Sequence, residues 1–164
     1  MRRITLVVTT LLLLAAVNVT IYQRETLLSS GRVVLLELAP VDPRSLMQGD
    51  YMALRFQVAN HAFAGQNFMK LEDGYLVVAV DERDVASFVR FDDGSTLAEN
   101  EVLLRYRIRN GQSRFATNAF FFQEGHARDY EQAKFGEFRV ARDGESILTR
   151  LRDEQLNVLT HKEK

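Results

Sequence analysis

The sequence contains no cysteine, and this absence excludes disulfides, thiolate nucleophiles and cysteine-based metal sites. Histidine is scarce as well: only His61, His126 and His161 occur, far apart in the chain. A zinc site normally needs three or four protein ligands. The chain also lacks a glycine-rich phosphate loop, a nucleophile elbow and an HExxH helix. We therefore expect no metal site and no cofactor.

The sequence also lacks an excess of charge of one sign. Its 21 lysines and arginines nearly balance 22 acidic residues, which gives a formal net charge of −1. Proteins that bind polyanions carry a marked basic excess. Nucleic acid is therefore excluded as a partner of the protein as a whole.

The first two dozen residues contain a long hydrophobic run. Arg2 and Arg3 precede an uncharged stretch from Ile4 to Tyr22, after which Arg24 and Glu25 nearly cancel in charge. As a helix rising about 1.5 Å per residue, this stretch spans roughly 28 Å, close to the ~30 Å hydrocarbon thickness of a bilayer. We therefore expect a cytoplasmic terminus over residues 1–3 and a single transmembrane helix over residues 4–24, with the rest of the chain on the far side of the membrane.

A cleaved secretory signal is the alternative interpretation of this start. Such a signal ends in a small-x-small cleavage site. Ala16 and Asn18 come nearest to that pattern and match it poorly. We therefore expect an uncleaved anchor.

The remaining chain is long enough for one domain with a sizeable core. We expect a short stalk over residues 25–31, a β domain over 32–155 and a C-terminal tail over 156–164. Within the stalk, the helix should end at Ser29-Ser30-Gly31, with Gly31 taking the positive φ typical of a helix end.

Hydrophobic alternation and turn residues predict a series of short strands in this domain. Asp-Gly and Asn-Gly pairs typical of hairpin turns separate several of them. We expect a short helix or a mobile loop over 59–71 and a helix over 124–135 that ends at Gly136. The expected strands cover residues 32–39, 51–58, 75–81, 85–91, 101–109, 112–122, 137–141 and 146–152. The fold class is therefore mainly β, a β-rich barrel or sandwich with one or two short helices, preceded by a single N-terminal transmembrane helix.

The Asn110-Gly111 turn predicts the pairing of the two strands around it. A two-residue type I′ turn fixes the register of both strands, so Arg109 should lie opposite Gln112. Counting outward, Tyr106 then opposes Phe115 as an inward aromatic pair.

The same register predicts a basic face on the outer side of this hairpin. Arg107 should lie opposite Arg114, and like charges paired in this way are destabilising unless anions lie beside them. One interpretation is a solvated face balanced by carboxylates from neighbouring strands; the other is a surface for phosphate headgroups or a partner protein. The basic face comprises Arg105, Arg107, Arg109 and Arg114.

The octapeptide from Gly49 to Phe56, with the sequence GDYMALRF, resembles the defining motif of the GDYXXLXY domain family. The resemblance extends upstream through residues 38–46 and downstream through 120–126, 136–140 and 151–153, so it covers about residues 31–153. Phe56 stands where the family motif has tyrosine.

The resemblance implies a bacterial membrane-anchored protein of unassigned biochemistry. Members are usually found beside, or fused to, multi-spanning membrane proteins, which implies a partner of that kind in the same membrane. From this and from the positive-inside bias of Arg2 and Arg3, we expect an anchor in the bacterial inner membrane with a cytoplasmic N-terminus and a periplasmic or otherwise extracytoplasmic domain. The resemblance supplies no reaction and no cofactor.

The residues of the motif have a structural interpretation and a functional one. Gly49 can take a positive φ at a tight turn, and Asp50 can accept hydrogen bonds from turn amides or from Arg44. The functional interpretation is an edge that contacts a ligand or a partner. Its candidate residues are Asp42, Arg44, Gly49, Asp50, Tyr51, Leu54 and Phe56.

A second candidate cluster lies at the start of the expected helix over 124–135. Glu124, His126, Tyr130 and Glu131 bring two carboxylates, an imidazole and a phenol together there, and such groups can transfer protons. A glutamate at a helix start is also favoured by the helix dipole alone.

Two functions follow from these observations. The first is a non-enzymatic extracytoplasmic β domain that acts as an accessory or interaction subunit of an integral membrane partner. The alternative is an envelope ligand-binding or hydrolytic domain whose site lies between the turn at residues 49–51 and the segment 124–131.

Overall fold

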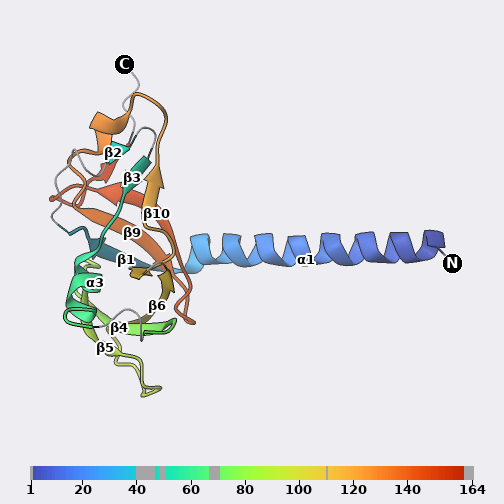
Figure 1. Cartoon of the computed structure of the whole chain (residues 1–164), viewed down its shortest axis with the longest axis horizontal. Helices are drawn as coiled ribbons and strands as arrows, with labels where there is room; N and C mark the ends of the chain where they lie inside the picture. The colour runs from blue at the N-terminus through green and yellow to red at the C-terminus, as the bar shows by residue number, and fades with distance from the viewer. Residues whose placement is uncertain (1, 40–46, 49–50, 67–70, 110, 161–164) are drawn as a thin grey trace.

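The computed structural model describes residues 2–39, 47–48, 51–66, 71–109 and 111–160. A long helix, α1 (Arg2–Ser30), extends away from a β-rich domain (Figure 1). The part from Leu6 to Ser30 is long and apolar enough to cross a membrane, and none of its most apolar stretch is buried against the domain. The expected apolar N-terminal helix is therefore confirmed.

The helix ends at Ser30, as predicted, but the role expected of Gly31 was wrong. Gly31 is not among the positive-φ glycines of the described chain. A Cβ atom at Gly31 would instead collide with the Leu27 carbonyl oxygen and lie 3.1 Å from the Arg139 Cβ. The Gly31 N–H donates to the Leu27 carbonyl at 2.9 Å, and the Arg139 guanidinium donates to the Gly31 carbonyl at 3.1 Å. Glycine therefore lets the helix end pack closely against the domain.

Antiparallel strands form three sheets in the described chain. The first has the order β1 (Arg32–Glu37), β9 (Phe135–Val140), β10 (Ser146–Arg152), β11 (Val158–Leu159). The second has the order β5 (Ala86–Phe91), β4 (Gly74–Val80), β6 (Glu101–Arg109), β7 (Gln112–Arg114). The third is small and has the order β2 (Met47–Gln48), β3 (Tyr51–Ala53), β8 (Ala119–Phe121). The mainly β fold class is confirmed.

The two larger sheets are joined at two places and curl around one core. Leu35 forms a bridge with Val85, and its N–H donates to the Asp84 carbonyl at 2.7 Å. The Arg105 N–H donates to the Gly144 carbonyl at 3.0 Å. Buried side chains from all three sheets form one continuous cluster, which includes Val34, Met52, Leu76, Leu104, Phe138 and Leu151.

The segment predicted as one strand over 51–58 ends sooner than expected. Strand β3 stops at Ala53, and helix α3 (Gln57–Ala62) begins four residues later. The predicted alternation of burial nevertheless continues through the junction: Met52, Leu54, Phe56 and Val58 are buried. Helix α3 overlaps the stretch for which a short helix or a loop was expected.

Two further predictions need correction. The strand expected over 112–122 is divided into β7 and β8, which belong to different sheets. The helix expected over 124–135 was wrong, because this stretch contains only the 3₁₀ turn η2 (Ala127–Tyr130) and then enters β9. Gly136 lies within β9, where a Cβ atom would be 3.1 Å from the Phe138 ring and 3.3 Å from the Phe56 ring. Glycine here serves core packing and does not end a helix.

The predicted hairpin register is confirmed. Arg109 lies opposite Gln112, Arg107 lies opposite Arg114, and Gly111 in the turn has a φ of +69°. Tyr106 and Phe115 both face the core, as expected. Their ring contacts are with other residues, since the Tyr106 ring packs against the rings of Phe63 and Phe91, and the Phe115 ring packs edge-on against that of Phe56.

Candidate functional site

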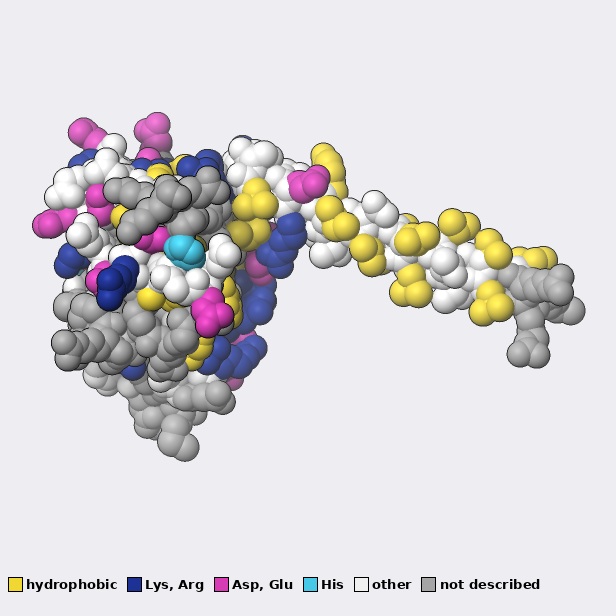
Figure 2. All heavy atoms as spheres, turned by 90° about the horizontal axis from the view of Figure 1, so that it is seen from above, with side chains coloured by type: hydrophobic (Ala, Val, Ile, Leu, Met, Phe, Trp, Pro, Cys, Tyr) yellow, Lys and Arg dark blue, Asp and Glu magenta, His cyan; other side chains and the backbone are white. Residues whose placement is uncertain are grey.

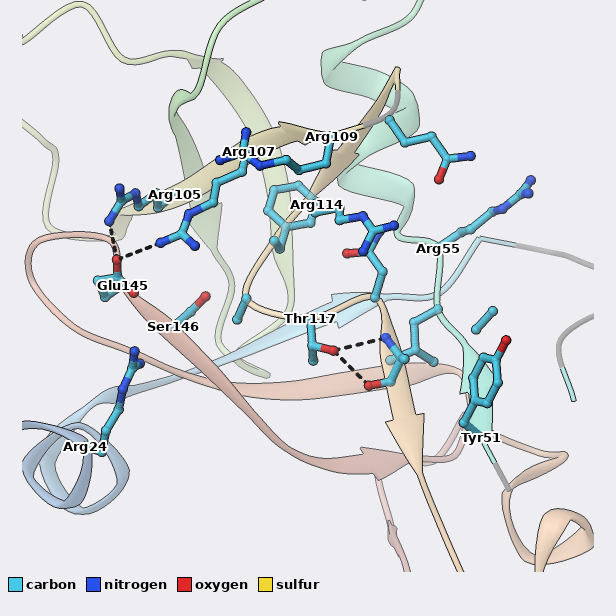
Figure 3. Close-up of a pocket in the computed structure, with 17 residues that line it drawn as sticks. Arg24, Tyr51, Arg55, Arg105, Arg107, Arg109, Arg114, Thr117, Glu145 and Ser146 are labelled. Carbon is cyan, nitrogen blue, oxygen red and sulfur yellow. Dashed lines mark hydrogen bonds and ion pairs between the residues drawn. The ribbon is translucent and has the colours of Figure 1, made fainter. Parts of the chain in front are cut away.

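A groove of about 640 Å³ lies between the end of α1, the β6–β7 hairpin and the start of β10 (Figure 3). The motif strand β3 and residues 115–119 complete its wall. Among the described residues, its lining holds one carboxylate, that of Glu145, and no lysine. We call this cavity the arginine groove, after the six arginines that line it: Arg24, Arg55, Arg105, Arg107, Arg109 and Arg114.

Strand alternation explains how four of these arginines come to share a face. Along β6, Val102, Leu104 and Tyr106 point into the core, so the residues between them point outward. The outward positions include Arg105 and Arg107, and the β6–β7 register adds Arg114 beside Arg107. The predicted basic face therefore forms one side of the groove.

Carboxylates from neighbouring segments balance part of this face. Glu145 forms ion pairs with Arg105 and, at 3.7 Å, with Arg107. Asp73 receives two hydrogen bonds from the Arg109 guanidinium, at 2.9 and 3.0 Å, and one from the Ile108 N–H at 2.8 Å. The bonds from Arg109, and then that from Ile108, hold the pKa of Asp73 below its ordinary value of 3.8. The balanced-face interpretation thus applies to Arg109 and, in part, to Arg105 and Arg107, which share one carboxylate.

The remaining groove arginines have no such balance within the described chain. No described carboxylate lies within ion-pair distance of Arg24, Arg55 or Arg114. All three side chains are exposed to solvent. Because guanidinium groups stay protonated at any physiological pH, the groove carries an excess of positive charge.

The floor of the groove also contains buried polar atoms. Ser146 is only 4% exposed, and within the described part of the chain neither its hydroxyl oxygen nor the Asn118 Oδ1 has a hydrogen-bond partner. The Asn118 amide nitrogen is used, since it donates to the Ser113 carbonyl at 3.2 Å. Buried polar groups are nearly always paired, and an unpaired one costs about 1–3 kcal/mol. The two residues line the groove, and their unpaired oxygens lie just behind its surface with almost no contact with solvent.

The motif residues are divided between the groove and the core. Tyr51 and Leu54 line the groove, and the Tyr51 ring lies 5.8 Å from the Phe121 ring of β8. Phe56 is buried in the core. The other candidates of this segment, Asp42, Arg44, Gly49 and Asp50, lie outside the described residues.

The cluster over 124–131 does not contribute to the groove. The Tyr130 ring packs between those of Phe120 and Phe122, and the His126 Nδ1 lies 3.1 Å from an Asp129 carboxylate oxygen. Glu124 is exposed, and neither Glu124, His126 nor Tyr130 lines the cavity. A site between this cluster and the turn at residues 49–51 stays a prediction, because Gly49 and Asp50 are not described.

Sequence reasoning missed several groove residues. Arg55 was predictable, because the alternation over 51–58 puts it on the same outward face as Tyr51. Arg24 entered the sequence argument only as a charge after the apolar run. For Glu145, Ser146 and Asn118 no local pattern indicates a shared cavity, since sheet packing alone brings residues 118 and 145–146 together.

Comparison with known proteins places these residues within a family. No curated protein and no solved structure gives a significant match to the chain. The family described as GDYXXLXY protein matches residues 13–151, a range that includes every residue lining the arginine groove. Because this match covers most of the sequence, the chain belongs to the GDYXXLXY protein family.

Proposed function

We propose that this protein is a membrane-anchored interaction domain that binds an anionic group at the membrane surface and serves as an accessory subunit of an integral membrane partner. The arginine groove at the end of an apolar helix is the observation that carries this proposal. In this proposal the anchor lies in a bacterial inner membrane, as the family resemblance implies. The domain is extracytoplasmic, since Arg2 and Arg3 favour a cytoplasmic N-terminus.

The chemistry of the groove favours binding over catalysis. Arginine guanidinium groups stay charged and do not exchange protons near neutral pH, so they are poor acids and bases. They form paired hydrogen bonds with carboxylates and phosphates. A cavity lined by six of them and by one described carboxylate therefore suits the recognition of an anion.

The junction between helix and domain supports a role close to the bilayer. Helix α1 continues unbroken from Arg24 to Ser30, a rise of roughly 9 Å at about 1.5 Å per residue. Leu27 is buried at this junction, and Arg139 donates to the carbonyl of Gly31. The domain is thus held at a short, fixed distance from the end of the apolar run.

Purification from detergent tests the partner. Two versions of the full chain are compared, one with the native anchor and one with residues 4–22 replaced by an unrelated single span. We expect both to retain the same multi-spanning membrane protein in stoichiometric amount, because the domain itself makes the contact. Retention of no integral membrane protein by either version would contradict the accessory role.

A further inference from the structure

We propose that the arginine groove binds the phosphate headgroup of an anionic phospholipid, taken from the leaflet at which α1 leaves the membrane. The inference rests on the proposed membrane anchoring and specifies the anion of that same site. It accounts for three properties of the groove: its depth relative to the bilayer, its charge and its unpaired polar atoms.

The depth follows from the position of Arg24. The apolar run of α1 ends at Tyr22, whose ring is exposed as in residues of the membrane interface. Arg24 comes two residues later and lines the groove. If the run from Ile4 to Tyr22 fills the hydrocarbon layer, Arg24 lies at the level of the lipid phosphates. One wall of the groove therefore begins in the headgroup layer.

The basic side chains of the groove lie on the side of the domain nearest to this headgroup layer. Figure 2 shows lysine and arginine side chains gathered on the face of the domain beside the end of the helix. Arg55 and Arg114 contribute exposed guanidinium groups with no described carboxylate beside them. Glu145 is shared between Arg105 and Arg107, so it neutralises one of the two while it holds both in position. Basic residues near an anionic bilayer surface are attracted to its headgroups.

The polar atoms of the floor complement a phosphodiester with a hydroxylated headgroup. Ser146 and Asn118 line the groove (Figure 3), but their unpaired oxygens have almost no contact with solvent, so a small side-chain movement must bring them to its surface. After that movement the Ser146 hydroxyl can donate to a phosphate oxygen, and the Asn118 Oδ1 can accept a hydrogen bond from a headgroup hydroxyl. A phosphoglycerol headgroup offers both groups, whereas phosphocholine has no hydroxyl and carries a cation that the arginines would repel.

Size and access favour a lipid over a folded protein. A volume of about 640 Å³ lies within the roughly 300–1,000 Å³ typical of small-molecule sites. Arg24, two residues beyond the apolar run, lines the groove, so in the proposed topology lipid headgroups lie beside it. An acidic protein segment would have to enter between the domain and the membrane, and the experiment below includes it as a competing outcome.

Native mass spectrometry of the full chain in detergent micelles tests the proposal. The protein is titrated with phosphatidylglycerol and, separately, with phosphatidylcholine of the same acyl chains. We expect preferential retention of phosphatidylglycerol. The double variant Arg107→Gln and Arg114→Gln should weaken that retention at least ten-fold, since each guanidinium removed is a charge-assisted partner of the phosphate. Arg83→Gln is the matched control, because Arg83 is an exposed arginine that does not line the groove.

Ser146→Ala separates binding from folding. Removal of a buried hydroxyl that has no described partner should leave the thermal unfolding of the lipid-free protein unchanged or raise its midpoint. Retention of phosphatidylglycerol should nevertheless fall several-fold. A purely structural role for Ser146 would instead lower stability and leave lipid retention intact.

Two soluble probes distinguish the outcomes. Equal retention of the two lipids, or unchanged retention in the double arginine variant, would overturn the lipid proposal. If glycerol phosphate or an acidic peptide still bound the wild type and not the double variant, the anion-binding function would stand without the lipid. Failure of every anionic probe to bind would overturn the proposed anion-binding function as well.

Discussion

Phe56 shows how a single residue of the motif contributes to this fold. Its side chain is 1% exposed, and its ring packs edge-on against the rings of Phe115 and Phe138, at centroid distances of 5.8 and 5.5 Å. The position at which the family motif has tyrosine is therefore occupied here by a ring that joins three parts of the core. Its contribution is to packing.

We expect Phe56→Ala to lower the free energy of unfolding by about 3–5 kcal/mol, because it removes a buried ring and leaves a cavity. Phe121→Ala is the matched control: Phe121 is 74% exposed, and its loss should change stability by no more than about 0.5 kcal/mol. Urea unfolding followed by circular dichroism measures both. Equal effects of the two substitutions would contradict the packing role of Phe56.

Asp73 makes the stability of the folded protein depend on pH. Its pKa lies below 3.8 because Arg109, and then the Ile108 N–H, donate to the carboxylate. A carboxyl whose folded pKa is lowered stabilises the protein above the unfolded pKa, and this stabilisation is lost as pH falls through the folded value.

We therefore expect Asp73→Asn to be less stable than the wild type near pH 7, with a difference that shrinks steadily below about pH 4. Thermal unfolding measured between pH 7 and pH 2.5 checks this. Glu82→Gln serves as the control, because Glu82 is exposed and forms no ion pair with a described residue. A wild type and Asp73→Asn that stay equally far apart at pH 2.5 would contradict the assignment.

Among the elements, the β9–β10 hairpin fixes one side of the groove against β6. Its turn residue Gly144 has a φ of +82°, and its carbonyl accepts the Arg105 N–H at 3.0 Å. This bond fixes the hairpin against β6 and brings Glu145 beside Arg105 and Arg107. A Cβ atom at Gly144 would lie 2.9 Å from the Tyr75 ring, so the turn requires glycine both for its conformation and for its close approach.

Gly144→Ala should therefore be more destabilising than Gly94→Ala. Gly94 has a similar φ of +78° but nothing within 4 Å of its Cβ position. A left-handed conformation costs an alanine about 1–2 kcal/mol at either site, and only Gly144 adds the clash with Tyr75. Equilibrium unfolding of the two variants isolates this contribution, and equal losses would mean that the Tyr75 ring moves aside without cost.

At the scale of the whole molecule, the helix and the domain act as one body. Gly31 is the only residue between α1 and β1, and the Arg139 guanidinium donates to its carbonyl. No flexible linker separates the apolar helix from the first strand. In the proposed topology, the height of the groove above the bilayer is therefore set by the register of the helix.

Protease treatment of spheroplasts tests the arrangement of the whole chain. We expect an externally added protease to digest the domain and to spare a tag fused before Met1, because the proposed topology keeps the helix as an uncleaved anchor with a cytoplasmic N-terminus. A cytoplasmic marker protein should stay intact as the control for membrane integrity. A mature chain that begins beyond Tyr22, or a domain protected from the protease, would contradict the proposed topology.

The sequence by itself determined the features that depend on neighbours along the chain. The uncharged run from Ile4 to Tyr22, the alternation over 51–58 and the β6–β7 register, and with it the basic face, all follow from local periodicity and turn chemistry. Composition misled where tertiary packing prevailed: the stretch before Gly136 looks helical, yet the chain enters a central strand there. At Gly136 a Cβ atom would lie only 3.1 and 3.3 Å from the rings of Phe138 and Phe56.

Only the tertiary structure decided that Arg24, Arg55, Arg107 and Ser146 share one groove. These residues come from an N-terminal helix, the segment after β3 and strands of two different sheets. Their meeting depends on how the sheets join, through contacts such as the Arg105 N–H with the Gly144 carbonyl. Such contacts link residues far apart in the sequence, and a periodic pattern carries information only about residues that are close together.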